Sequence, residues 1–179
     1  MPNTNKKLRL FEALELRAEY DARIKTLRDC LPESREGRSR LSLLRTEEGF
    51  YRPAPDFDVA RAREELRKLE RRRRKLNSAI QQANFERRIT FHGDTISLHE
   101  ALEIRKGLNE QLGELHSQVV KAAYQRVIYK EGRDIVEPSD MSYSEAVKQL
   151  EAARRDFREL NREIRKASFD TPVDFQDEE

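Results

Sequence analysis

The sequence predicts an all-α protein, in which a duplicated helical hairpin forms a four-helix bundle with coiled-coil-like packing and carries two short β-hairpin arms. Three observations predict this fold: an internal repeat, four stretches with heptad spacing, and an unusually charged composition. Residues 10–17 (LFEALELR) return as residues 98–105 (LHEALEIR), and residues 76–85 return as residues 160–169. Two matched blocks in the same order indicate a duplicated unit.

The two copies of this unit span approximately residues 8–91 and 97–175, within a single domain of residues 1–179. Charged residues make up 39% of the chain, against roughly 25% in an average domain, while the net charge is only +2. Long amphipathic helices suit this composition, because a narrow apolar stripe leaves wide faces for charge. The low net charge and the strict periodicity of the apolar residues argue against disorder.

Each predicted helix has an apolar stripe, here called the seam, whose positions are separated by alternating steps of three and four residues. A repeat of about 3.5 residues holds one stripe against partner helices, as in coiled coils and bundles. The four seams are Leu10, Ala13, Arg17, Tyr20, Ile24, Leu27 and Leu31; Ala62, Leu66, Leu69, Arg73, Leu76, Ile80 and Ala83; Leu98, Ala101, Arg105, Leu108, Leu112, Leu115 and Val119; and Ala146, Leu150, Ala153, Phe157, Leu160, Ile164 and Ala167.

The helix ends are marked by capping residues and by a proline. In a capping box, a Ser oxygen and a Glu carboxylate accept hydrogen bonds from amide groups that the first turn leaves unpaired. Pro32 predicts the end of the first helix. The residues expected to cap the other helices are Asp56 or Asp58, Ser97 with Glu100, and Ser142 with Glu145.

Two short β-hairpins are expected between helices. Residues 89–91 and 95–96 flank the turn His92-Gly93-Asp94, and residues 127–129 and 134–136 flank a turn at Glu131-Gly132. The linker 32–56 has its own Glu-Gly pair, so the duplication could extend to it, but its role stays open. An isolated hairpin is marginal in water, so we expect these arms to pack on the bundle or on a second subunit.

Two arginines fall on the seam at the same place in each repeat, which is costly unless each charge is paired. One interpretation is a structural polar layer that sets helix register. Another is an anion site lined by guanidinium groups, and a third is that the side chains extend to solvent. The residues of the expected polar layer are Glu12, Arg17, Asn77, Glu100, Arg105 and Asn161.

The second helix is strongly basic. Residues 61–88 contain 11 basic and 4 acidic residues, a net charge of +7, and Arg73 and Arg74 lie within its run of five cations. Such a face either binds phosphate groups or is simply solvated. The acidic tail, residues 170–179, could neutralise it in the same chain or in another. Together with Arg17, Asn77, Arg105 and Asn161, Arg73 and Arg74 are the candidate ligand-binding residues.

Two phenylalanines, Phe85 and Phe169, end the repeated blocks. We expect them to fill the core, with ring stacking on a ligand as the alternative. Catalytic motifs are lacking: none of the three histidines has the Glu-x-x-His spacing of carboxylate-bridged metal bundles, and there is no phosphate-binding glycine loop or nucleophile elbow. We therefore expect no catalytic residue, no metal and no cofactor, and an enzyme is a weaker hypothesis.

Over roughly residues 8–175, the chain resembles the small bacterial proteins labelled septicolysin, although we expect Asn-Trp where it has Ser168-Phe169. The resemblance implies an oligomeric helical bundle with hairpin arms and no established biochemical activity. The label suggests a pore-forming toxin, for which the sequence offers no membrane segment. The matching residues are Glu12-Ala13-Leu14, Arg17-Ala18, Arg23-Ile24 and Leu27-Arg28; Asn77, Ile80 and Ala83-Asn84; Gly93-Asp94-Thr95-Ile96-Ser97-Leu98, Glu100-Ala101-Leu102 and Arg105-Lys106; and Leu160, Ile164 and Ala167-Ser168-Phe169-Asp170-Thr171.

These observations favour a non-catalytic, self-associating cytoplasmic protein that acts as an assembly or interaction module. The alternative is binding or sequestration of an anionic, nucleotide-like small molecule at arginine-rich subunit interfaces. We expect a homo-oligomer, no nucleic acid partner and no membrane association. Cys30 is the single cysteine, which fits a reducing cytoplasm, and the polar N-terminus has no secretory signal.

Overall fold

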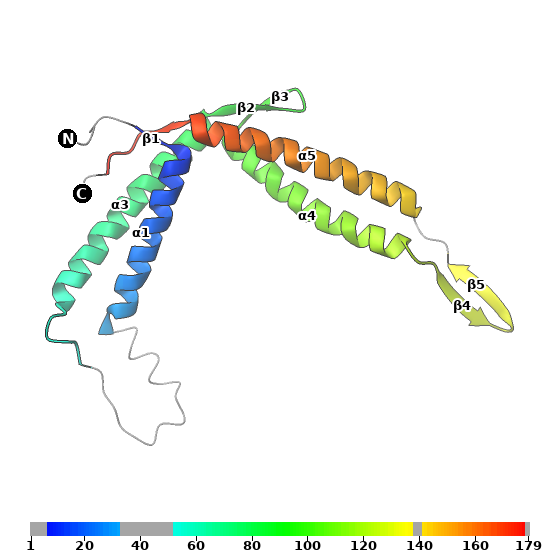
Figure 1. The fold of residues 1–179 in the computed structure, drawn as a ribbon, viewed down its shortest axis with the longest axis horizontal. Coiled ribbons are helices and arrows are strands. Elements are labelled where there is room, and N and C mark those ends of the chain that lie inside the picture. Colours follow the sequence, from blue (N-terminus) through cyan, green and yellow to red (C-terminus); the bar gives the residue numbers. More distant parts are fainter. Residues whose placement is uncertain (1–6, 33–51, 138–140, 178–179) are drawn as a thin grey trace, which may run out of the picture. The chain divides into compact units, whose positions relative to one another are not determined.

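The computed structural model describes residues 7–32, 52–137 and 141–177, so most of the linker 32–56, including Phe50-Tyr51, lies outside the described part. Its long elements are α-helices, accompanied by short antiparallel strand pairs (Figure 1). The helices are α1 (Leu10–Cys30), α3 (Val59–Glu86), α4 (Leu98–Ala122) and α5 (Tyr143–Asp170). The strands are β1 (Leu8–Arg9), β2 (Arg88–Phe91), β3 (Asp94–Ser97), β4 (Arg126–Lys130), β5 (Arg133–Glu137) and β6 (Pro172–Val173).

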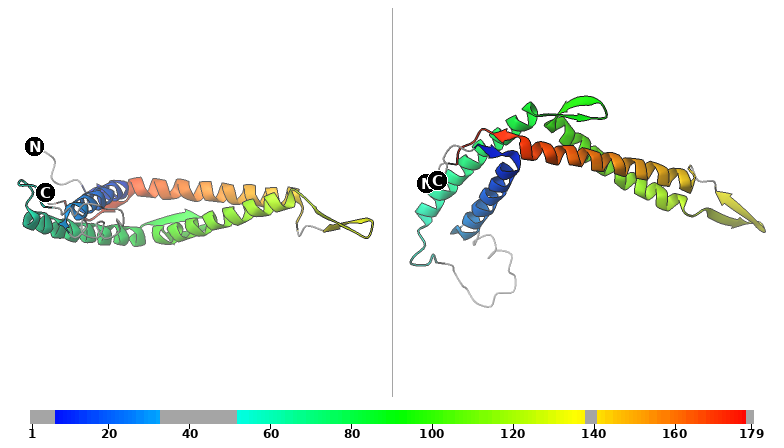
Figure 2. Two further views of the ribbon diagram at one scale, coloured as in Figure 1. Left: turned by 90° about the horizontal axis from the view of Figure 1, so that it is seen from below. Right: turned by 45° about the horizontal axis from the view of Figure 1, so that its top comes forward.

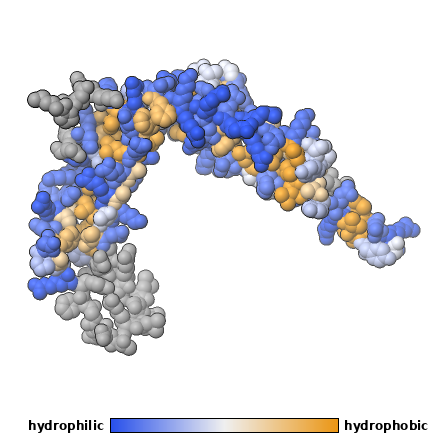
Figure 3. Space-filling view, viewed as in Figure 1, coloured by the Kyte–Doolittle hydropathy of each residue, from blue (hydrophilic) through white to orange (hydrophobic). Residues whose placement is uncertain are grey.

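The chain forms two compact units, and each contains one helical hairpin. Unit 1 is Met1–Ala83 with Phe169–Glu179, and unit 2 is Asn84–Ser168. Every predicted seam position is buried or half-buried, which confirms the heptad assignment of all four helices. The two leucines at equivalent places of the second helices, Leu76 and Leu160, have no exposed surface. The outer faces are charged, and most of the face seen in Figure 3 is hydrophilic.

Unit 1 places α1 beside α3, and the two helices run in opposite directions (Figures 1 and 2). Its ends are joined by a short ladder, in which Leu8 of β1 pairs with Val173 of β6. The Leu10 amide donates a hydrogen bond of 2.8 Å to the Thr171 carbonyl oxygen, and Val173 is fully buried. The segment that follows α5 therefore covers the start of α1.

Unit 2 places α4 beside α5, with an apolar core of Leu115, Leu150 and Ala153 flanked by Leu112 and Val119. Both predicted hairpin arms are confirmed: β2 pairs with β3, and β4 pairs with β5. Each turns through two residues with positive φ, His92-Gly93 (50° and 89°) and Glu131-Gly132 (54° and 76°). These are type I′ turns, whose twist matches that of a hairpin and whose second position favours glycine.

The predicted caps are largely confirmed. The Ser97 hydroxyl accepts the Glu100 amide at 3.1 Å, and the Glu100 carboxylate accepts the Ser97 amide at 2.6 Å, which completes the capping box of α4. At α5, Ser142 accepts the Glu145 amide at 3.2 Å. Asp58, rather than Asp56, caps α3 by accepting two amides.

The start of α1 has the same hydrogen-bonding pattern as the start of α4, although the sequence did not predict it. The Arg9 amide donates to Glu12 at 2.6 Å, as the Ser97 amide donates to Glu100. The Leu98 amide donates at 2.8 Å to the Arg87 carbonyl oxygen, which matches the bond from Leu10 to Thr171. The first amide of α1 and that of α4 are therefore each accepted by the carbonyl just after a second helix, Thr171 after α5 and Arg87 after α3, and in both units this carbonyl comes from the other sequence repeat.

Candidate functional site

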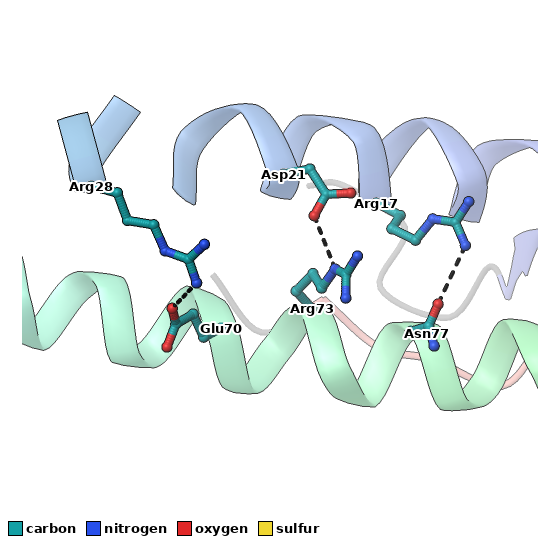
Figure 4. A network of polar contacts seen from close by, with 6 residues as sticks. All are labelled: Arg17, Asp21, Arg28, Glu70, Arg73 and Asn77. Atoms are coloured by element: carbon teal, nitrogen blue, oxygen red, sulfur yellow. Dashed lines mark hydrogen bonds and ion pairs between the residues drawn. The ribbon is translucent and has the colours of Figure 1, made fainter. Parts of the chain in front are cut away.

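Three of the polar contacts between α1 and α3 in unit 1 form what is here called the polar ladder (Figure 4), apart from a longer ion pair between Arg23 Nη2 and Glu65 Oε1 at 3.8 Å. They join Arg28 Nη2 to Glu70 Oε1 at 2.6 Å, Arg73 Nε to Asp21 Oδ1 at 2.9 Å, and Arg17 Nη1 to Asn77 Oδ1 at 3.3 Å. The spacing of these rungs follows from the antiparallel helices: as one partner advances along α1, the other retreats along α3.

The polar ladder suits a structural role. The side chains of Asp21 and Arg73 are 49% and 39% exposed, and such surface pairs contribute about 0–1 kcal/mol each. Their value lies in geometry, because a shift of one helix along the other would break all three contacts together. They thus favour one register of α1 on α3, which is the best-attested use of polar groups at helix interfaces.

The ladder includes only part of the predicted polar layer. Arg17 is half-buried and bonds Asn77, another residue of the expected layer. Arg105, its half-buried equivalent, makes no hydrogen bond or ion pair with other residues that the structure describes. Asn161 donates from Nδ2 to the Phe157 carbonyl oxygen at 2.9 Å, within its own helix.

The two glutamates of that predicted layer lie elsewhere. Glu12 and Glu100 accept amide hydrogen bonds at the starts of α1 and α4. The Ser97 side chain and then its amide hold the pKa of Glu100 below its usual value. Their position in the repeated block therefore reflects helix capping.

The basic run of α3 is only partly neutralised. Arg73 pairs with Asp21, while Arg71, Arg74 and Lys75 are exposed. Among the described residues, no hydrogen bond or ion pair is formed by Arg74. This part of α3 therefore offers an open positive surface, whereas Arg17 and Arg73 already have partners in their own chain.

The acidic tail, which belongs to unit 1, contacts other parts of this unit through residues outside the predicted site. Tyr20 is buried and donates a hydrogen bond from its hydroxyl to Asp177, and Lys7 lies 3.4 Å from Asp174. Burial, helped by the hydrogen bond and the negative charge of Asp177, raises the pKa of Tyr20 to about 12. A tyrosine on a seam is a signal for such a contact, because a buried hydroxyl needs a partner.

The expectation that Phe85 and Phe169 fill the core is wrong. Their side chains are 55% and 58% exposed. Each lies against the second residue of a first helix: the ring centroids of Phe169 and Phe11 are 4.7 Å apart, and those of Phe85 and His99 are 4.3 Å apart. The two positions come two residues after the last seam positions, Ala83 and Ala167, so the heptad count itself places them on the outer side of the last helical turn.

The β4–β5 hairpin, here called the arm, carries the largest group of exposed apolar side chains in a described strand pair. Val127, Tyr129, Ile135 and Val136 are all exposed, Tyr129 by 75%. No other described helix or strand packs extensively against the arm, which lies beyond the ends of α4 and α5 (Figure 1). A two-stranded hairpin is marginal by itself in water, so this surface is the candidate functional site.

In residues 7–32, 52–137 and 141–177, no group of three or more His, Cys, Asp or Glu side chains could hold a metal ion. His92 lies 3.4 Å from Asp156, and both are partly exposed. No described helix combines the length and the apolar character needed to cross a membrane.

Comparison with known proteins identifies the fold without a function. No protein-family model matches the chain, and no curated protein matches it either. A solved structure, described as the crystal structure of a functionally unknown conserved protein from Corynebacterium diphtheriae, is similar with a TM-score of 0.64. The sequences are 21% identical, and the match covers 94% of this chain and 99% of the other. This likeness establishes a shared fold over nearly the whole length of both chains.

Proposed function

We propose that this protein is a non-catalytic, self-associating assembly module, and that the arm supplies an association surface. The observation that carries the proposal is the exposure of apolar side chains on a hairpin that nothing in its own described chain covers. Unpaired strand edges with apolar side chains are a liability on a monomer and a natural docking surface in an oligomer.

Three further expectations belong to this proposal. Each compact unit supplies one helical hairpin, so the predicted four-helix bundle would form if two such hairpins packed against each other. Cytoplasmic localisation is supported by Cys30, an exposed free cysteine. Relationship to the septicolysin-labelled proteins is supported by the matching motifs alone, and we propose no pore-forming activity.

Light scattering at micromolar concentration tests self-association. The expected mass is at least twice 21.2 kDa. Replacing Tyr129 and Val136 by Ser should reduce the mass toward that of one chain, because it removes apolar surface from the arm. Tyr124→Ser is the matched control, since Tyr124 is 84% exposed but lies outside the strands. A monomer at all micromolar concentrations would contradict the proposal.

A second function, anion binding by α3, is favoured by the open positive surface at Arg71, Arg74 and Lys75. Attraction to such an exposed face is screened over about 10 Å at 0.1 M salt. Calorimetry with mono-, di- and cyclic nucleotides should therefore show binding at low salt that weakens at moderate salt and is lost in Arg74→Glu. Binding weaker than about millimolar at low salt would exclude this function.

A further inference from the structure

We propose that two copies of the chain join along the free edge of β5, around a two-fold axis at Ile135, to form a four-stranded antiparallel sheet. This inference rests on the proposed self-association and names the surface, register and side chains that produce it. In this register Arg133 of each copy lies opposite Glu137 of the other, and the two Ile135 side chains lie opposite each other.

The ladder of the arm determines which backbone groups are available. Lys130 pairs with Arg133 beside the two-residue type I′ turn, and Ile128 pairs with Ile135. Such a turn closes on a hydrogen-bonded pair, and hydrogen-bonded and non-hydrogen-bonded pairs then alternate along the ladder. The backbone groups of Arg133, Ile135 and Glu137 thus face β4, which leaves those of Asp134 and Val136 on the free edge.

The free backbone groups and the side chains select the same register. Two β5 strands centred on Ile135 place Asp134 of one copy opposite Val136 of the other, so these residues exchange backbone hydrogen bonds. A shift of one residue toward the turn would place the two Asp134 carboxylates opposite each other. Like charges directly opposite destabilise a strand pair, whereas opposite charges and apolar pairs stabilise it.

Charge also distinguishes the two edges of the arm. The same two-fold pairing along β4 would be centred on Ile128, because Arg126 and Lys130 are equally spaced around it. Each arginine would then lie opposite a lysine of the second copy. The β5 edge is therefore self-complementary, and the β4 edge repels its own copy.

One face of the resulting sheet would be apolar in the middle and charged at both sides. The central row contains Ile128 and Ile135 of each copy, because cross-strand partners share a face. In the flanking row, Glu137 lies between two arginines: Arg126 of its own chain, at 3.4 Å, and Arg133 of the second copy. The pairing thus extends a charge contact that the single chain already makes.

Charge reversal tests the register. In Arg133→Glu, glutamates occupy positions 133 and 137, and in Glu137→Arg, arginines occupy both, so each variant repels itself twice in the dimer. Analytical ultracentrifugation at low salt should show self-association at least about tenfold weaker for each variant alone. An equimolar mixture should associate again, because each glutamate then lies opposite an arginine. A variant that had merely lost its fold would not be restored by mixing.

The matched control is Lys130→Glu, which makes the same change of charge on the β4 side of the arm and should leave self-association within about twofold. If the unmodified protein associates while both reversals leave its affinity unchanged, or while the mixture fails to associate, the β5 pairing is overturned and self-association itself stands. If the unmodified protein is a monomer, both proposals fall.

A disulfide test is independent of charge. In a Cys30→Ser background, Ile135→Cys should form a covalent dimer on mild oxidation, because directly opposite residues in a non-hydrogen-bonded pair have Cα atoms about 4.5 Å apart. Val136→Cys is the control, since two residues at position 136 would be about 8 Å apart, beyond disulfide range. Equal cross-linking at both positions would contradict the register.

Discussion

Tyr20 combines burial with a hydrogen bond to a carboxylate, so its ionisation is linked to folding. The Asp177 acceptor comes from the tail, 157 residues further along the chain. Because the pKa is raised from 10.0 to about 12, mainly by burial, the folded state holds the phenolic proton more tightly than the unfolded state. This contribution to stability is complete below pH 10 and is lost as the pH rises through 12.

Tyr20→Phe isolates that contribution. At pH 7 the variant should lose about 1 kcal/mol, because Phe keeps the ring in the seam but removes the hydrogen bond to Asp177. Between pH 10 and 12 the unmodified protein should lose stability more steeply than the variant, so the difference narrows. Urea unfolding at a series of pH values measures both. Parallel pH profiles would show that Tyr20 ionises equally well in both states.

Among the elements, helix starts could be predicted most precisely from the sequence, down to single capping residues. The capping box of α4 and the Ser142 cap of α5 could be predicted because each depends on residues three apart, whose spacing is visible in the chain. The start of α1 was not predicted as a box, since Arg9 is not a usual capping residue and the pattern appears only when Glu12 is seen to accept its amide.

At the element scale, Ser97→Ala should destabilise α4 by about 1 kcal/mol, the usual loss for an N-cap. Ser142→Ala should cost less, because Ser142 is exposed and caps α5 through a single longer bond. The pKa of Glu100 is held below its usual value of 4.5. The contribution of its carboxylate to stability is therefore present above pH 4.5 and falls as the pH drops through the folded pKa. The Ser97→Ala difference should therefore shrink in acid. Denaturant titrations at pH 7 and pH 3 provide the comparison, and equal losses at both would contradict this account.

Across the whole molecule, the seams and arms could be predicted because both depend on local periodicity, and all 28 seam positions are buried or half-buried. The division into two units could not be predicted. It depends on contacts between segments remote in sequence, such as the hydrogen bond from Leu10 to Thr171, and an internal repeat does not indicate which segments will be in contact. Only the first-repeat half of the predicted polar layer forms among the described residues, because Arg105 has no contact equivalent to the one between Arg17 and Asn77. Phe85 and Phe169 were misplaced because large apolar residues at a helix end were assigned to the core, although the heptad count places them off the seam.

The two-unit organisation predicts that damage to one core stays within its unit. Leu76 and Leu160 occupy equivalent repeat positions with no exposed surface, one in unit 1 and one in unit 2. Truncating either to Ala should cost about 2–5 kcal/mol, because it leaves a cavity in a core of only two helices. Under native conditions, hydrogen exchange of Leu160→Ala should accelerate in α4 and in α5 up to Ser168, while α1 and residues 59–83 keep their protection. Leu76→Ala should show the reverse pattern, which makes each variant the control for the other. Equal acceleration in both units would mean that the chain unfolds as one cooperative body despite its two cores.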